Sequence, residues 1–322
     1  MSHSTTPSLA EPHREQVEAP ARPVLISLFL SLRPSQWTKN LIIFAGLIFG
    51  QRLLDPVAVL RSIAAFAIFC VLAGVVYLLN DVADREADRR HPIKRLRPIA
   101  SGAVAPSTAV VTAIVLAIVG LGLAWLLSPP FAGVAALYVA LLALYSGPLK
   151  HIVIIDVLTI SIGFVLRAVA GAVVIGVAIS HWLLIVTSLG ALFLALSKRR
   201  HELVLLADGA TGHRRILEEY SPYLLDQMIG VVTASTLVSY VIYTVSPETQ
   251  QKFHTSYLGV TLIYLLYGIF RYLYLVHQKD GGGSPTDMLL NDRPLLMCVA
   301  LWALTVAIII YGSDLLTVFG VS

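Results

Sequence analysis

Nine apolar stretches, each about as long as a membrane-spanning helix, constrain the fold of this 322-residue chain. They cover residues 24–49, 61–80, 107–127, 131–146, 153–176, 181–198, 227–245, 257–276 and 294–312. A helix needs roughly 20 apolar residues to cross the ~30 Å hydrocarbon core of a bilayer. Only 13% of the residues are charged, which is about half the share typical of a soluble domain. The sequence therefore predicts an all-α membrane protein built as a bundle of nine transmembrane helices.

The N-terminal part of the chain departs from this pattern in two ways. The first apolar stretch contains Arg33, Pro34 and Lys39, which predict a broken or kinked helix, because proline removes a backbone hydrogen bond. Residues 1–23 are rich in Ser, Pro, Glu and Ala and lack the basic and apolar regions of a signal peptide. We expect a disordered cytosolic tail over residues 1–23 and a single transmembrane domain over residues 24–322.

The distribution of basic residues predicts the orientation of the chain, because cytosolic loops of membrane proteins carry an excess of Lys and Arg. With the N-terminus in the cytosol, 19 of the 23 Lys and Arg residues fall in inner segments. These segments are 1–40, 80–101, 145–152, 197–220 and 271–293. The outer loops hold only Arg52, Arg61 and Lys252, and Arg167 lies within a span. We therefore expect a plasma-membrane protein whose polar clusters face the cytosol.

Composition argues against several other kinds of site. The net charge is only +4, so the bulk charge gives no support to nucleic-acid binding. Cys70 and Cys298 both lie in apolar stretches, and we interpret them as small buried residues rather than a disulfide or metal site. Small residues on the helix surfaces would suit contacts in a homo-oligomer, but they suit packing within one bundle equally well.

The segment "NDVADREAD", residues 80–88, places acids at the cytosolic end of the second span. Asn80, Asp84 and Asp88 are spaced i, i+4 and i+8, so on a helix they follow one face, and Asp81 borders it. Ionisable groups in membrane helices are costly and usually functional. Mg²⁺ typically takes one or two protein carboxylates together with substrate phosphate oxygens. We predict an Mg²⁺ site on these four residues; the alternative is a solvated helix end whose acids pair with the neighbouring arginines.

Further charged residues follow near later spans. In "YSGPLKHIVIID" (residues 145–156) the Ser-Gly-Pro sequence predicts a turn at the mouth of a cavity, carrying Tyr145, Lys150 and Asp156. Lys150 suits phosphate binding, and the alternative is a lysine that only sets topology. Arg167 follows Asp156 by eleven residues, close to three helical turns, so both lie on one face, beside Gly163. We expect Asp156 or a substrate phosphate as the partner of Arg167.

The last basic group is "SKRRHEL", residues 197–203, at the end of the sixth span. Lys198 and Glu202 share a helix face (i, i+4), and Arg199 lies on the next one. These residues are candidates for phosphate binding, and the alternative is a basic belt that reaches back to the membrane interface.

These segments together resemble the UbiA superfamily of intramembrane prenyltransferases. "NDVADREAD" matches the NDxxDxxxD motif of that superfamily, "RLRPIASG" is also typical of it, and the likeness runs from "LRPSQWTKN" to "NDRPLLMCVALW". The resemblance implies nine transmembrane helices around a central cavity that opens to the cytosol. It also implies that Asp81, Asp84 and Asp88 are catalytic and, with Asn80, bind Mg²⁺ and a diphosphate.

Within the superfamily, "RPSQWTKN", "YSGPLKHIVIIDV", "AVAGA" and "SKRRHEL" resemble the branch of decaprenyl-phosphate phosphoribosyltransferases. The reaction implied transfers 5-phosphoribosyl from phosphoribosyl diphosphate to a long polyprenyl phosphate, such as decaprenyl phosphate, and releases diphosphate. In that branch the product leads to cell-wall arabinan. The residues that we expect to bind the donor are Lys39, Asn80, Lys94, Arg97, Tyr145 and Lys150. Those that we expect at the acceptor phosphate are Lys150, Asp156, Arg167, Lys198, Arg199 and Glu202.

Two other functions are weighed against this one. A UbiA-type prenyltransferase that moves a polyprenyl group from its diphosphate to an aromatic acceptor usually carries a second aspartate-rich motif. Here that position keeps a single carboxylate, Asp156, and has gained Lys150. A transporter would need polar groups along a path through the membrane, whereas the charged residues of this chain gather on one side.

Overall fold

The computed structural model describes residues 23–91, 93–207, 215–279 and 283–318, and these residues form helices and turns without a strand. The predicted N-terminal tail lies, except for Pro23, outside the described residues. The helices of the N-terminal half are α1 (Val24–Ser31), η1 (Pro34–Ile43), α2 (Phe44–Phe49), α3 (Pro56–Ala83), α4 (Arg85–Arg90), η2 (Lys94–Leu96), α5 (Pro98–Ser101), α6 (Pro106–Leu127) and α7 (Pro129–Ser146). Those of the C-terminal half are η3 (Leu149–His151), α8 (Ile155–Val174), α9 (His181–Ala207), η4 (Arg215–Glu219), α10 (Pro222–Val245), α11 (Pro247–Phe253), η5 (Tyr257–Thr261), α12 (Leu262–Gln278), α13 (Pro285–Asn291) and α14 (Arg293–Val318).

Eight helical segments in the described part of the chain are long and apolar enough to cross a membrane. They are Pro56–Ala83, Pro106–Leu127, Pro129–Ser146, Ile155–Val174, His181–Val204, Pro222–Val245, Tyr257–Gln278 and Arg293–Gly312. These segments correspond to the second to ninth apolar stretches of the sequence, which confirms the all-α membrane class.

The first apolar stretch is divided into α1, η1 and α2, as its polar interruptions predict. Arg33 separates α1 from η1 in a left-handed conformation with φ of 53°, and Pro34 begins η1. A non-glycine residue rarely adopts a positive φ, and proline is suited to the first position of a helix. The break therefore explains why this stretch is not one of the eight continuous spans.

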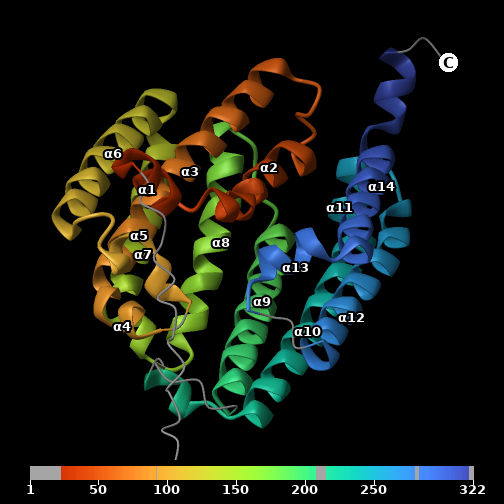
Figure 1. Ribbon diagram of the computed structural model, residues 1–322. Helices are drawn as coiled ribbons and strands as arrows, with labels where there is room; N and C mark the ends of the chain where they lie inside the picture. The colour runs from red at the N-terminus through yellow and green to blue at the C-terminus, as the bar shows by residue number, and fades with distance from the viewer. Residues whose placement is uncertain (1–22, 92, 208–214, 280–282, 319–322) are drawn as a thin grey trace, which may run out of the picture.

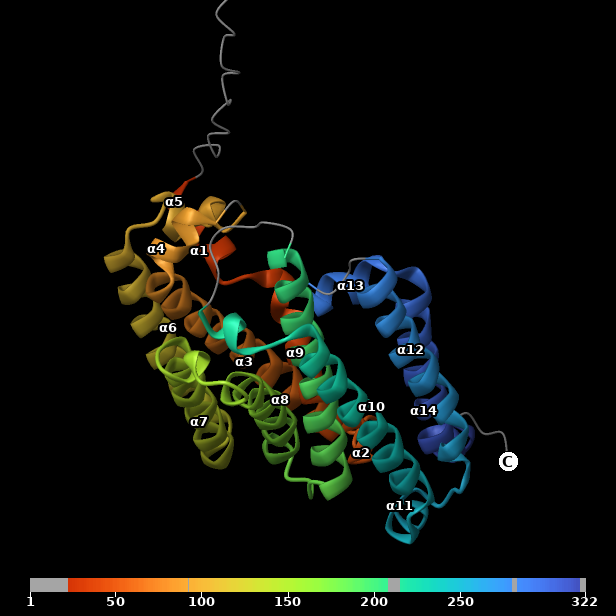
Figure 2. The same ribbon diagram turned by 90° about the horizontal axis from the view of Figure 1, so that it is seen from below.

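The long helices follow one another around the bundle (Figures 1 and 2). In Figure 2, α6, α7, α8, α9 and α10 succeed one another from the left to the centre, and α12 and α14 lie at the right. Helix α3 packs on α6, α7 and α8, while α12 packs on α14. The buried core on the α3 side includes Phe69, Phe131 and Tyr138. This packing leaves the N-terminal elements η1 and α2 against α8.

Two glycines explain how the broken first stretch can lie directly on α8. A Cβ atom at Gly171 would lie 1.9 Å from the carbonyl oxygen of Ile43, and one at Gly46 would lie 2.7 Å from the backbone nitrogen of Ala172. Only glycine permits such a close approach of two backbones. The contact holds η1, which carries Lys39 and Asn40, beside the C-terminal part of α8.

A single added methyl group tests this backbone contact. We expect Gly171→Ala to destabilise the protein by about 1–3 kcal/mol or more, because the new Cβ forces η1 away from α8. Gly122→Ala on α6 is the matched control, since nothing lies within 4 Å of a Cβ at Gly122. Thermal unfolding in detergent, followed by size-exclusion chromatography, measures the difference. Equal melting temperatures for the two variants would show that η1 does not pack on α8 in this way.

Candidate active site

The acids of "NDVADREAD" lie where α3 ends and α4 begins. The sequence predicts one continuous helix face, but α3 ends at Ala83 and Asp84 stands between the two helices. The backbone N–H of Asp84 donates to the carbonyl of Asn80 (2.8 Å), and that of Asp88 donates to the carbonyl of Asp84 (2.8 Å). These backbone bonds between residues four apart keep Asn80, Asp84 and Asp88 at helical spacing across the break. We call Asn80, Asp81, Asp84 and Asp88 the acidic cluster.

Each carboxylate of the acidic cluster contacts a basic side chain. Arg97 Nη1 donates to Asp81 Oδ1 (3.2 Å) and to Asp88 Oδ2 (2.6 Å), and Arg33 Nη2 also donates to Asp81. Lys150 donates to Asp84 Oδ1, whose second oxygen accepts a bond from the Asn80 amide (3.0 Å). Sequence reasoning grouped Arg97 and Lys150 with the acidic cluster but missed Arg33, which it treated only as a helix interruption.

The alternative of a solvated helix end paired with the neighbouring arginines is wrong. Arg85 and Arg89 both pair with Glu86, at 3.8 Å and 3.3 Å, and not with the acidic cluster. The Asp81 and Asp88 side chains are 3% and 6% exposed. These aspartates are therefore buried. Asp88 is held by Arg97, nine residues later, and Asp81 by Arg97 and by Arg33 from 48 residues earlier.

The donor atoms of the acidic cluster fit Mg²⁺. Carboxylate and amide oxygens are the hard ligands that this ion prefers, and Asp81 and Asp88 lie close enough together to share one guanidinium nitrogen of Arg97. The described residues contain no group of three acidic, His or Cys side chains already placed to hold a metal. An ion bound here would complete its coordination with water or with phosphate oxygens from a substrate.

The turn that carries Lys150 is anchored at its far end. α7 ends at Ser146, as the Ser-Gly-Pro sequence predicts, and Lys150 lies in η3 with 5% exposure. Ile154, just before α8, has φ of 69°, which is rare for a β-branched residue. Its N–H donates to the hydroxyl of Tyr220 (2.7 Å), and that hydroxyl donates to Asp156 Oδ1 (2.9 Å). Burial raises the pKa of Tyr220 to about 12, so the hydroxyl keeps the proton that it donates.

Asp156 is the centre of a second set of charged residues. Arg199 Nε donates to Asp156 Oδ2 (2.8 Å), and its other nitrogens donate to Glu202 and to the Tyr145 hydroxyl (3.2 Å). Asp156 is fully buried and Arg199 is 2% exposed. We call Tyr145, Asp156, Arg199, Glu202 and Tyr220 the Asp156 network. Its members bind one another, so the one carboxylate left at the second-motif position is held by Arg199.

Arg167 lies in a third, separate set of contacts. It donates to Asn40 Oδ1 (2.7 Å), to the Gly163 carbonyl (2.9 Å) and to the Tyr138 hydroxyl (2.6 Å). Of the two partners expected for Arg167, Asp156 is therefore wrong, and a substrate phosphate stays a prediction. The arginine instead ties α8 to η1 and α7, and nothing in the sequence distinguished Tyr138 from the other tyrosines.

The remaining predicted cations lie on other elements. Lys39 is on η1, half-buried, and makes no ion pair with any described residue. Lys94 begins η2, where its backbone N–H donates to His91 Nδ1 (3.3 Å). Burial, followed by the charge of Lys94, lowers the pKa of His91. Lys198 pairs with Glu202 (3.8 Å), which confirms that these two residues share a helix face.

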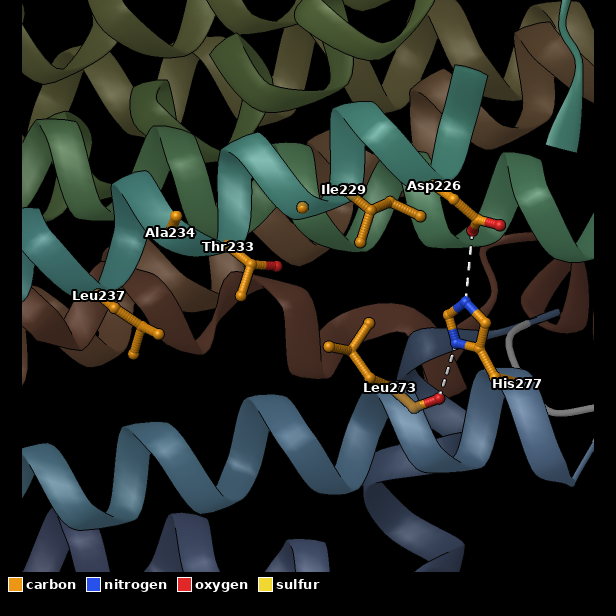
Figure 3. A pocket seen from close by; sticks show the side chains of 8 residues that line it. Asp226, Ile229, Thr233, Ala234, Leu237, Leu273 and His277 are labelled. Atoms are coloured by element: carbon orange, nitrogen blue, oxygen red, sulfur yellow. Dashed lines mark hydrogen bonds and ion pairs between the residues drawn. The ribbon is translucent and has the colours of Figure 1, made fainter. Parts of the chain in front are cut away.

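An open cavity of about 360 Å³ lies between α10 and α12 (Figure 3). Its wall is mostly apolar, with Ile229, Leu237 and Leu273, and at one end His277 contacts Asp226 (3.3 Å). None of the predicted site residues lines this cavity. The acidic cluster, with its buried carboxylates and their basic partners, is the candidate active site.

The sequence model of the UbiA prenyltransferase family matches residues 40–291, which include the acidic cluster and the Asp156 network. The chain belongs to the UbiA prenyltransferase family. Two curated relatives are both named decaprenyl-phosphate phosphoribosyltransferase. The relative from Corynebacterium glutamicum is 32% identical over 94% of this chain and 93% of its own length. The relative from Mycobacterium tuberculosis is 34% identical over 90% of this chain and 96% of its own.

Solved structures agree with the UbiA fold. A UbiA homologue from Archaeoglobus fulgidus bound to GPP and Mg²⁺ aligns with a TM-score of 0.69, over 88% of this chain and 99% of that one. Its sequence identity is 17%, so the likeness concerns the fold. The same homologue bound to DMAPP and Mg²⁺ aligns with a TM-score of 0.68. Membership of this family indicates an integral membrane protein, which accounts for the long apolar helices.

Substitution of two neighbouring cations on α9, Arg199 and Lys198, tests whether the Asp156 network stabilises the fold. We expect Arg199→Met to destabilise the protein by about 3–5 kcal/mol, because it leaves the buried Asp156 carboxylate without its cation. Lys198→Met should change stability by no more than about 1 kcal/mol, because the Lys198 side chain is 42% exposed. Thermal melting of both detergent-purified variants measures this contrast. If the two variants melt together, Arg199 does not hold the Asp156 network.

Proposed function

We propose that this UbiA-family protein transfers 5-phosphoribosyl from phosphoribosyl diphosphate to a long-chain polyprenyl phosphate and releases diphosphate. Decaprenyl phosphate is the acceptor that the names of the relatives suggest. The observation that carries the proposal is the difference between the two acid positions. The acidic cluster has its full set of carboxylates, whereas Asp156 is taken up by Arg199 and Lys150 reaches Asp84. Such a site suits one diphosphate and one phosphate monoester rather than a second metal-bound diphosphate.

The donor would lie at the acidic cluster. Mg²⁺, when bound through Asp84 with Asp81 or Asp88, would neutralise charge that grows on the leaving diphosphate. Arg97 and Lys150 already contact these carboxylates and are close enough to turn toward phosphate oxygens. Lys94, on η2 near the acidic cluster, would bind the remaining donor phosphate. We assign Asn80 to the metal and donor and Tyr145 to the edge of the donor site.

The acceptor would enter from the bilayer with its phosphate toward the same end of the bundle. The second pKa of a phosphate monoester is about 6, so the attacking oxygen is ionised near neutral pH and needs no strong base. Lys39 is one candidate cation for this phosphate, because no described carboxylate lies within ion-pair distance of it and only Asp287 is near enough to attract it. Lys198 is a second candidate, because its ion pair with Glu202 is long (3.8 Å) and its side chain is 42% exposed. Asp156, Arg167 and Arg199 would act by holding the surrounding helices.

The proposal also covers the membrane topology, the domain organisation and the use of the product. The broken α1–η1–α2 segment would count as the ninth membrane crossing, and the cavity would open to the cytosol at the plasma membrane. Residues 24–322 would act as one catalytic domain, and the product would serve synthesis of cell-wall arabinan. A homo-oligomer is compatible with this arrangement.

Product analysis distinguishes this function from aromatic prenylation. The purified protein receives Mg²⁺ with either phosphoribosyl diphosphate plus polyprenyl phosphate, or polyprenyl diphosphate plus an aromatic acid. We expect a phosphoribosylated lipid from the first mixture and no product from the second, as measured by mass spectrometry. Asp84→Asn is the matched control, and it should form no product, as should the native protein with excess EDTA. A prenylated aromatic acid, with no ribosyl transfer, would overturn the proposed function.

Thiol labelling of intact cells tests the orientation. Ser101 follows the acidic cluster, Gln251 lies on α11 at the other end of the bundle, and both side chains are exposed. The native Cys70 and Cys298 are buried and free, so their background should be low. An impermeant reagent added outside should label Gln251→Cys but not Ser101→Cys, because the basic segments face the cytosol. Labelling of Ser101→Cys but not of Gln251→Cys would show that the chain has the opposite orientation.

A further inference from the structure

The acidic cluster and its basic partners form a balanced set. In the described part of the chain, the three carboxylates of Asp81, Asp84 and Asp88 face three cations. These cations, Arg33, Arg97 and Lys150, come from the α1–η1 break, the end of η2 and the α7–α8 turn. Every carboxylate contacts at least one of them. The basic side chains therefore occupy oxygens that a metal ion would need.

Burial makes this occupancy energetically important. Asp81 and Asp88 have side-chain exposures of 3% and 6%, and Lys150 has 6%. A buried carboxylate that loses its cation without replacement is strongly destabilising. A divalent ion could replace the cations at the carboxylates, but the displaced arginines and lysine would then lie beside it with no anion. Metal binding alone is therefore opposed by like-charge repulsion.

A diphosphate removes this repulsion. Its oxygens complete the coordination of Mg²⁺, which takes only one or two protein carboxylates, and they accept hydrogen bonds from the displaced cations. We propose that Arg33, Arg97 and Lys150 are placeholder cations, which block the acidic cluster until a metal ion and a diphosphate bind together. This inference rests on the proposed function only in placing a diphosphate at the acidic cluster. It adds that the metal and the diphosphate bind cooperatively.

The pair between Lys150 and Asp84 is the one that opens. Asp84 is 20% exposed, much more than Asp81 or Asp88, so an ion can reach it first. Among the described residues Asp84 has a single cationic partner, and its other oxygen accepts a bond from the neutral Asn80 amide. Lys150 lies in a short turn rather than in a long helix, and its ammonium carries three donors that can turn to phosphate. Lys150 thus exchanges a carboxylate for a phosphate oxygen.

Metal binding to the full-length protein tests this inference without measuring turnover. Electron paramagnetic resonance measures bound Mn²⁺ at fixed free Mn²⁺, with and without inorganic diphosphate. We expect the native protein to bind Mn²⁺ at least tenfold more tightly when diphosphate is present. By thermodynamic linkage, Mn²⁺ must strengthen diphosphate binding by the same factor, which labelled diphosphate measures independently.

Substitutions show whether the basic side chains cause the cooperativity. We expect Lys150→Gln to bind Mn²⁺ alone at least tenfold more tightly than the native protein and to lose most of the gain from diphosphate. Arg33→Gln should also bind Mn²⁺ alone more tightly and gain less from diphosphate. It provides the test if Lys150→Gln fails to fold. The matched control is Arg271→Gln, which removes the partner of Asp292 (2.8 Å) on α12 and should change neither measurement. Asp84→Asn should bind Mn²⁺ weakly in both conditions.

Two results would overturn the inference. One is equal Mn²⁺ affinity of the native protein with and without diphosphate. The other is a Lys150→Gln or Arg33→Gln variant that folds and binds Mn²⁺ alone no more tightly than the native protein. Either result leaves the proposed function standing if the phosphoribosylated lipid is still formed. Conversely, an enzyme that prenylates an aromatic acid could still show cooperative binding, because its donor also carries a diphosphate.

Discussion

Pairing of buried charge is the constraint on which the rest of this structure depends. A bilayer cannot solvate an ion, so each charge near the membrane interior needs a partner from the protein. At the acidic cluster the chain supplies these partners where a helix is interrupted. Arg33 lies at the break between α1 and η1, Arg97 follows η2, and Lys150 lies between α7 and α8. The breaks thus bring cations from three parts of the chain to the acids at the end of α3.

The basic residues fall into two physical groups. Arg167 and Arg199 are buried, and each makes hydrogen bonds through three of its nitrogens to groups of the protein. Such side chains hold helices together, because moving them would expose several unpaired groups at once. The partners of the acidic cluster are different. Arg33 and Arg97 are about one quarter exposed, and Lys150, although only 6% exposed, contacts Asp84, which is 20% exposed. Exchange of partners is feasible only for this second group, and it is the basis of the proposed coupling between metal and diphosphate.

The Asp156 network has a consequence for chemistry as well as for stability. The UbiA fold is retained at 17% identity to a homologue that binds GPP and Mg²⁺. In this chain the carboxylate near the second-motif position is fully buried against Arg199. That carboxylate would need to lose a buried ion pair before it could hold a metal. The same network anchors the strained Ile154 and therefore the turn that carries Lys150. A structural ion pair thus supports the cation that reaches Asp84.

The sequence by itself determined the membrane class, the eight continuous spans, the broken first stretch and the residues of the acidic cluster. Hydrophobic length and residue spacing are local properties, so they can be read along the chain. The partners were decided by tertiary structure. Arg33 met Asp81 across 48 positions, and Tyr138 and Asn40 rather than Asp156 became the partners of Arg167. Asp156 met Arg199 and Tyr220, which come from later elements. Spacing fixes which side chains share a helix face, but only the packing of different helices decides which charge meets which.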